Sequence, residues 1–311
     1  MLTITLLGTA ATMPLPDRAL SAAFIQCGGH GILFDCGEGT QAAARRAGVN
    51  LMRTDVICLT HYHGDHIFGL PGLLQTLGCQ ERKKPLLLLG PRGMEEIAGA
   101  LRTLTGPLPY PVQWQQADAA PILLETIAPG WAVGAKLLPF RTKHRVPSLG
   151  YRLELPRAGR FAPEKARALG VPVQQWKLLQ QGQPVEAAGR RVLPQEVLGA
   201  PRRGLSVVFS GDTAPCAALA AAARDTDLLI CDATYALPEQ EAQAKQWGHS
   251  TFGQSARIAE QAGAHRLWLT HYSPMITDPE EALAPAQAIF PATECGTDGK
   301  TITLQFEEVP Q

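Results

Sequence analysis

The chain has 311 residues, of which 45% are hydrophobic, and 28 basic and 28 acidic residues give it a formal net charge of zero. This composition is ordinary for a globular protein with a sizeable core. The neutral balance argues against a protein that coats nucleic acid nonspecifically, although it leaves room for a local basic patch.

The seven cysteines are dispersed and include no C-x-x-C pair, which favours reduced thiols in a cytosolic protein. The first eight residues are typical of a strand and lack the basic and long apolar regions of a signal peptide. No apolar run reaches the ~20 residues that a membrane crossing needs. We therefore expect a soluble, cytoplasmic protein that does not bind a membrane.

Strands and helices alternate along the chain. Apolar runs predict strands at residues 2–7, 22–27, 31–35, 55–60, 86–89, 136–140, 149–155, 205–210, 227–231, 267–270 and 301–306. Helical patterns occur at residues 40–47, 93–104, 216–224, 250–262 and 279–288. This mixture predicts α/β layers in which helices cover sheets.

The most informative segment is the hexapeptide His61-Tyr62-His63-Gly64-Asp65-His66, which directly follows a predicted buried strand. Side chains two apart on extended backbone share a face, so His61 and His63 can bind one ion together. Gly64 lets the chain reverse, which can bring Asp65 and His66 toward a second ion. Imidazole and carboxylate without thiolate suit Zn²⁺, Mn²⁺ or Fe²⁺ in an open hydrolytic site.

Residues 151–204 differ from their surroundings. They contain ten basic and four acidic residues, a net charge of +6, and are rich in glycine, proline and glutamine. We expect a protruding, poorly packed arm, and the alternative is a long solvated loop with incidental charge. The basic residues of this segment include Arg157, Arg160, Lys165, Arg167 and Lys177.

Three further metal-ligand candidates lie at the ends of predicted strands: His144, Asp212 and His271. The tetrapeptide Leu59-Thr60-His61-Tyr62 recurs as Leu269-Thr270-His271-Tyr272, as expected of two related halves. We assign His61, His63, His144 and Asp212 to one ion and Asp65, His66, His271 and Asp212 to the other. Asp212 would bridge the pair, because a carboxylate has two oxygens for two cations about 3.5–4 Å apart.

The chain resembles ribonuclease Z, the transfer-RNA 3′-processing endonuclease family of the metallo-β-lactamase superfamily. The matching segments span nearly the whole chain: residues 7–9, Phe34-Asp35-Cys36-Gly37-Glu38-Gly39-Thr40-Gln41, residues 59–73, His144 with residues 150–152, Phe209-Ser210-Gly211-Asp212-Thr213, Gly248-His249-Ser250-Thr251 and Leu269-Thr270-His271.

This resemblance implies a single domain over residues 1–311, folded as a four-layer αββα sandwich with an inserted arm at about 151–204. It also implies two zinc ions per chain, a homodimer, and precursor transfer RNA as the substrate, whose body the arm holds. Asp65 matches the residue that accepts a proton from the attacking water, and His249 matches a histidine that assists the leaving oxygen. Asp35 and Glu38 are either supports that orient a ligand histidine or parts of a structural turn.

Two segments depart from the family pattern. Cys231-Asp232-Ala233-Thr234 stands where the family typically has His-Glu-Ala-Thr, whose glutamate orients the late histidine. Because aspartate is one methylene shorter, we expect its contact with His249 to be longer, water-mediated or absent. The glycine- and proline-rich stretch of the family's arm is replaced here by residues 171–177, in which Trp176 either stacks on RNA or packs within the arm.

We weigh three functions. The first is a zinc-dependent endoribonuclease that removes the 3′ trailer from precursor transfer RNA, with a metal-activated water attacking the phosphodiester and leaving a 3′-hydroxyl. The second is a phosphodiesterase or other hydrolase with the same site that acts on small esters. The third, a metal-stabilised RNA-binding module, is disfavoured because structural metal sites rarely keep open coordination.

Overall fold

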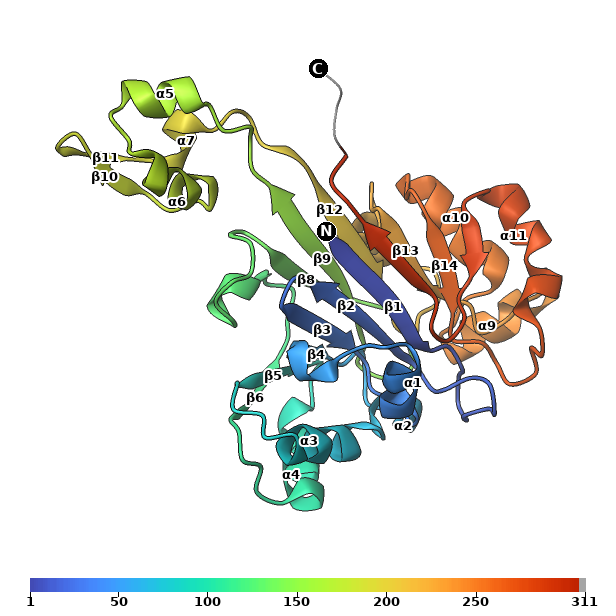
Figure 1. Ribbon diagram of the computed structural model, residues 1–311. Helices are drawn as coiled ribbons and strands as arrows, with labels where there is room; N and C mark the ends of the chain where they lie inside the picture. The colour runs from blue at the N-terminus through green and yellow to red at the C-terminus, as the bar shows by residue number, and fades with distance from the viewer. Residues whose placement is uncertain (308–311) are drawn as a thin grey trace.

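The computed structural model describes residues 1–307 and contains two seven-stranded sheets packed face to face (Figure 1). The first sheet has the order β16 (Thr301–Leu304), β1 (Leu2–Gly8), β2 (Ala22–Cys27), β3 (His30–Phe34), β4 (Thr54–Cys58), β5 (Leu86–Gly90) and β6 (Val112–Gln116). The second has the order β15 (Thr293–Cys295), β14 (Leu267–Thr270), β13 (Leu228–Asp232), β12 (Arg202–Phe209), β9 (Leu149–Arg157), β8 (Lys136–Arg141) and β7 (Ile122–Leu123).

Helices cover the outer face of each sheet. On the first sheet lie α1 (Thr40–Arg46), α3 (Leu70–Cys79) and α4 (Met94–Thr105), and on the second lie α8 (Ala217–Ala222), α10 (Phe252–Ala262) and α11 (Ala284–Ile289). The remaining helices outside the arm are α2 (Gly64–Ile67), α9 (Glu241–Trp247) and the short 3-10 turns η1 (Leu51–Arg53), η2 (Leu124–Thr126), η4 (Pro238–Gln240) and η5 (Pro279–Ala282). The predicted αββα sandwich is confirmed.

Alternation along the strands builds the layers. On β4, Val56 and Cys58 belong to the core between the sheets, whereas Ile57 belongs to the core beneath α1, α3 and α4. Successive side chains of a strand point to opposite faces, so a strand buried on both sides reads as a continuous apolar run. This explains why β4 could be recognised in the sequence before the sheets were known.

The predicted helix at 279–288 is wrong in one respect: the segment is divided into η5 and α11. Pro285 occupies the first turn of α11, where its missing N–H costs nothing, but in the interior of one long helix it would clash with the preceding turn. By contrast, α10 begins as a capping box in which Thr251 Oγ1 accepts from Gln254 N at 3.2 Å.

The arm is shorter than the predicted segment 151–204. Residues 149–157 form β9 and residues 202–209 form β12, both of them strands of the second sheet, so the arm comprises residues 158–201. It contains α5 (Pro163–Ala168), η3 (Val173–Gln175), α6 (Trp176–Gln180), β10 (Val185–Ala187), β11 (Arg190–Val192) and α7 (Pro194–Val197). Figure 1 shows it projecting from the ends of β9 and β12.

The arm is also better packed than expected. Leu179, Val192 and Val197 are fully buried in a small core of its own. Trp176 packs against Phe161 with ring centroids 5.3 Å apart, and its indole N–H donates to Val171 O at 3.0 Å. Trp176 therefore serves packing within the arm, one of the two alternatives left open by the sequence.

All seven cysteines are free thiols, as predicted. Across residues 1–307, no helix has both the length and the apolar character that crossing a membrane requires.

Candidate metal centre

The candidate ligands converge where the carboxyl ends of parallel strands from both sheets meet. The strands β3 to β6 run parallel in one sheet and β12 to β14 run parallel in the other. The hexapeptide follows β4, Asp212 follows β12 and His271 follows β14. The loop between β8 and β9, which carries His144, reaches the same edge because β9 is antiparallel to β12. Ligand sites in α/β sheets are typically found at such ends.

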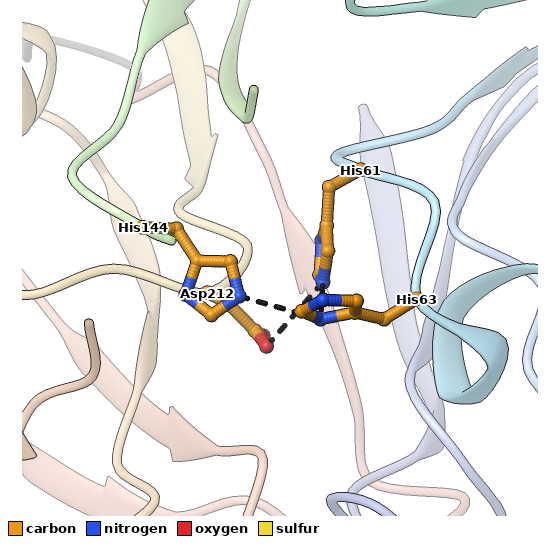
Figure 2. A group of neighbouring side chains, drawn as sticks. All are labelled: His61, His63, His144 and Asp212. Carbon is orange, nitrogen blue, oxygen red and sulfur yellow. Dashed lines mark hydrogen bonds and ion pairs between the residues drawn. The ribbon is translucent and has the colours of Figure 1, made fainter. Parts of the chain in front are cut away.

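The first ligand group consists of His61, His63, His144 and Asp212, whose ligand atoms lie within 4.8 Å of one another. Nδ1 of His63 is 2.9 Å from Nε2 of His61 and 3.3 Å from Nε2 of His144. Asp212 Oδ2 is 3.6 Å from Nε2 of His61. In Figure 2 the side chains of His61 and His63 point toward those of His144 and Asp212.

The second ligand group consists of Asp65, His66 and His271, joined by the other oxygen of Asp212. Asp212 Oδ1 is 3.3 Å from Nε2 of His66 and 3.3 Å from Nε2 of His271. Asp65 Oδ2 is 3.5 Å from the same nitrogen of His271. One oxygen of Asp212 thus faces each group, and its bridging of two ions stays a prediction.

These distances fit divalent cations. Ligand atoms bound tetrahedrally at about 2.0–2.1 Å from an ion are separated by about 3.3–3.4 Å, close to the separations in both groups. Asp212 Oδ1 is buried and receives no hydrogen bond from any residue in 1–307. A buried carboxylate oxygen without a donor is costly unless a cation neutralises it. The cluster is therefore capable of binding metal.

Protonation of the histidines agrees with this role. Burial, reinforced by His66, lowers the pKa of His61 well below its ordinary value, so this imidazole is neutral and able to bind metal. Burial would also lower the pKa of His66, but Asp212 and Asp35 outweigh it and raise that pKa well above its ordinary value. A metal ion would supply the positive charge that these carboxylates otherwise draw from a proton.

Neighbouring groups hold the second ring nitrogen of the ligand histidines. Thr60 Oγ1 is 3.0 Å from Nδ1 of His61, and Thr234 Oγ1 is 2.8 Å from Nδ1 of His271. Nδ1 of His144 donates to Gly248 O at 2.9 Å. Such contacts fix the tautomer and the ring orientation of a ligand. The roles of Thr60 and Thr234 were missed, although Thr60 belongs to the repeated Leu-Thr-His-Tyr segment.

Asp35 and Glu38, the two candidate supports, occupy different environments. Asp35 is fully buried and accepts from Nδ1 of His66 at 2.7 Å, from Thr60 N at 2.7 Å and from Thr60 Oγ1 at 2.8 Å. Glu38 is exposed, and within residues 1–307 its carboxylate makes no hydrogen bond to a ligand histidine. For Glu38 the structural-turn alternative is the better description.

His249 contacts Asp232 directly, although the aspartate side chain is one methylene shorter than the glutamate of the family. Nδ1 of His249 is 2.8 Å from Asp232 Oδ2, so the contact is direct and the expectation of a longer, water-mediated or absent one is wrong. The backbone compensates, because Asp232 ends β13 and also accepts from Thr213 N and Thr234 N at 2.9 Å each. Burial would lower the pKa of His249, but Asp232 outweighs it and raises that pKa to about 9.

Backbone conformation brings the ligands close. Gly211 has φ +58°, and a Cβ there would lie 2.7 Å from Cβ of Thr60, so only glycine allows the strand end that precedes Asp212 to approach β4. His271 and Asp35 adopt φ of +62° and +54°, a left-handed conformation that is unfavourable for non-glycine residues and clusters at functional sites.

The RNA-binding candidates lie apart from the metal centre, on or near the arm. Arg160, Lys165, Arg167 and Lys177 are exposed. Arg167 lies over the Trp176 ring at 5.4 Å. Arg157 belongs to β9 and its guanidinium packs over the ring of Phe306 at 5.0 Å, near the carboxyl-terminal part of the chain. With Arg152, Glu154, Arg157, Arg202 and Arg203 assigned to strands of the second sheet, the arm has six basic and three acidic residues and a net charge of +3.

The αββα layers and the histidine–aspartate cluster define a protein of the β-lactamase superfamily, and the model for the beta-lactamase superfamily domain matches residues 30–272. The chain is 41% identical over 308 residues to a protein named ribonuclease Z from Agathobacter rectalis, covering 99% of this chain and 100% of that protein. It is 43% identical over 286 residues to ribonuclease Z from Methanosarcina acetivorans, covering 91% of each. The chain therefore belongs to the ribonuclease Z family.

A solved structure agrees with this assignment. The short form of human tRNase Z superposes with a TM-score of 0.68 and 26% sequence identity, and the match covers 98% of this chain and 100% of that chain. The match therefore extends over nearly the whole of both chains.

Proposed function

We propose that the chain is a metal-dependent endoribonuclease that removes the 3′ trailer from precursor transfer RNA. The observation that carries this proposal is the pair of ligand groups sharing Asp212, found in a chain of the ribonuclease Z family. The human neighbour, named for transfer RNA, supports the substrate class.

Two Zn²⁺ ions per chain are part of the proposal, with Mn²⁺ or Fe²⁺ as alternatives, because imidazole and carboxylate ligands suit all three. His61, His63, His144 and Asp212 would hold one ion, and Asp65, His66, His271 and Asp212 the other. When bound, the ions supply a water of pKa near ~7 and positive charge beside the phosphate oxygens.

Two residues of the chain, Asp65 and His249, would carry out the two proton transfers. Asp65 Oδ2 accepts from Thr12 N at 2.7 Å. Asp65 is less buried than His66 and His271, so it can take a proton from the attacking water. His249, kept protonated by Asp232, can donate to the departing 3′ oxygen. The bond between phosphorus and this oxygen breaks, which leaves a 3′-hydroxyl on the transfer RNA and a 5′-phosphate on the trailer.

The arm would hold the body of the transfer RNA through the exposed side chains of Arg160, Lys165, Arg167 and Lys177. Phosphate contacts from basic side chains supply most of the sequence-independent affinity for nucleic acid. Arg157 is a weaker candidate, because its side chain is half-buried and its guanidinium packs on Phe306.

The alternative, a hydrolase for small esters, is favoured by one observation: the arm carries only +3 rather than the +6 of residues 151–204. Both functions use the same ligand groups, so only the substrate distinguishes them. The deciding experiment is incubation of the zinc-loaded protein with an end-labelled precursor transfer RNA, followed by mapping of the cut. A single cut at the 3′ end of the acceptor stem supports the endoribonuclease. Hydrolysis of small phosphodiesters with an intact precursor supports the alternative.

A homodimer and a cytoplasmic location belong to the same proposal. The resemblance to the family supports the dimer, which light scattering of the purified protein can test. Seven free thiols suit a reducing compartment.

A further inference from the structure

The loop that carries the ligand His144 also carries a row of basic side chains. Arg141, Lys143 and Arg145 are exposed, whereas His144 between them points to the metal centre. Arg141 ends β8 and Lys143 forms an isolated β-bridge with Ala214, so these two side chains share a face, whereas Arg145 lies in the bend that follows. At ~3.3 Å per residue, Arg141 and Lys143 lie about 7 Å apart along the chain.

Hydrogen bonds fix this loop in place. Lys143 N donates to Thr213 Oγ1 at 3.0 Å, and Ala214 N donates to Lys143 O at 2.9 Å, which ties the loop to the residues just after Asp212. Thr142 Oγ1 and Ser148 Oγ are 2.6 Å apart across the loop. The basic side chains are therefore carried by the same framework that positions the ligands.

A cavity of about 360 Å³ adjoins the Arg141 end of this row. Arg92, which follows β5, and Arg141 both line it, together with the carboxylate of Asp118. Within residues 1–307, neither guanidinium is in an ion pair with a carboxylate. Tyr62 of the hexapeptide donates to Pro91 O at 2.7 Å, so the cavity wall is connected directly to the metal-binding loop.

At the Arg145 end of the row lies an aromatic side chain, that of Trp247. The guanidinium of Arg145 lies over the Trp247 ring at 4.5 Å, and 43% of Trp247 is exposed. The next residue, Gly248, packs so closely that a Cβ there would lie 3.0 Å from Nδ1 of His144. Arg145 covers one face of the indole, so an unpaired base would stack on the other face.

We propose that Arg92, Arg141, Lys143 and Arg145, hereafter the basic strip, bind the phosphates of unpaired RNA next to the scissile bond, with Trp247 stacking on a base. This deepens the proposed function, on which it rests, by assigning a separate subsite to the single-stranded trailer. The arm and the basic strip lie at different places, so the body of the substrate and its trailer are bound independently. Asp118 limits the positive charge of the cavity.

The test is the double variant Arg92→Gln/Arg141→Gln, compared with the matched control Lys83→Gln/Lys84→Gln. The control removes two exposed cations from the opposite end of the same strand, just before β5. The readout is the salt dependence of binding of a fluorescent hexaribonucleotide to the zinc-loaded protein, with the RNA checked for integrity by electrophoresis. Each lost contact with a single strand lowers the slope of log affinity against log salt by about 0.7. We expect a decrease of about 1.4 for the double variant and no change for the control.

Cleavage provides the second readout. For a precursor with a long trailer, kcat/KM should fall about tenfold or more in the double variant, because contacts with charged groups are lost. Hydrolysis of bis(p-nitrophenyl) phosphate should stay within twofold of the wild type. An unchanged slope of log affinity against log salt, or equal losses of kcat/KM in the variant and the control, would contradict the proposed role of the basic strip. If the wild-type protein cleaves no precursor, the proposed function fails. The salt dependence of hexaribonucleotide binding would still show whether the basic strip binds RNA.

Discussion

Asp232 and His249 are in direct contact, with Asp232 Oδ2 2.8 Å from Nδ1 of His249, and this contact joins the end of β13 to the segment that precedes α10. Because Nδ1 is occupied by this contact, Nε2 is the nitrogen that could donate to a substrate. His249 belongs to neither of the two ligand groups described above, but with Asp212, Asp232 and His271 it forms a third group whose ligand atoms lie within 4.8 Å of one another. Metal analysis of a His249 variant therefore distinguishes the proposed proton donation from metal binding.

Replacing His249 with alanine should slow precursor cleavage by about 10²–10⁴-fold, the usual contribution of a general acid. Metal content should not change. Hydrolysis of bis(p-nitrophenyl) phosphate should fall only a few-fold, because p-nitrophenolate leaves without a proton. Steady-state kinetics on both substrates, with metal analysis of both proteins, measures this. Equal losses on the two substrates would show that His249 supports the metal centre and is not the acid.

Removing residues 158–201 and closing the gap with a short glycine–serine linker should abolish most precursor cleavage while hydrolysis of the chromogenic diester persists. The arm has its own core, so its removal leaves the cores of the two sheets covered. Thermal unfolding of the shortened protein serves as the control for folding. If both activities disappear together in a folded protein, the arm does more than hold RNA.

Gly211→Ala should destabilise the protein by more than Gly263→Ala. Both glycines have positive φ, +58° and +64°, so both variants incur about 1 kcal/mol of backbone strain. Only at Gly211 would the new Cβ meet Thr60, at 2.7 Å, whereas it meets nothing within 4 Å at Gly263. Chemical denaturation should give an additional loss of about 1–3 kcal/mol for Gly211→Ala, typical of overpacking. Equal losses would mean that the close approach to Thr60 is easily relaxed.

Glu154→Gln should lower stability only above acidic pH. Burial would raise the pKa of Glu154, but hydrogen bonds from Arg152 at 2.7 Å and from Lys136, 3.1 Å away, outweigh it and lower that pKa. A carboxylate with a depressed folded-state pKa stabilises the fold above its unfolded pKa of about 4.3, and this contribution disappears as the pH falls through the folded value. We expect a difference of about 0.5–1 kcal/mol at pH 7 that vanishes in acid. The exposed Glu260→Gln is the matched control, and a pH-independent difference would contradict the ion-pair explanation.

The positions of the candidate ligands could be predicted from the sequence because they follow strands that are recognisable as apolar runs. The strand β4 is apolar on both faces, and the repeat of Leu59–Tyr62 at Leu269–Tyr272 places His61 and His271 at equivalent ends of the two sheets. The pairing of Asp212 with both groups followed from its two oxygens alone.

Other features depend on contacts that are distant in sequence. The edge strand β6 has glutamine at three of its five positions, so its pattern lacks the apolar run of a buried strand. The Asp232–His249 contact was misjudged because side-chain length was considered without the path of the backbone. The arm's limits were misplaced because charge continues into β9 and β12, where Arg152 and Arg203 pair with Glu154 and Asp227.

The central claim is that Asp212 joins two metal ions, and anomalous scattering at the zinc edge from crystals of the zinc-loaded protein tests it most directly. The account predicts two peaks per chain on either side of Asp212, each about 2.0–2.2 Å from one of its oxygens. Asp212→Ala should lose metal from both positions, whereas His249→Ala should retain it. A single peak, or two peaks of full height in the Asp212→Ala variant, would contradict the bridging role.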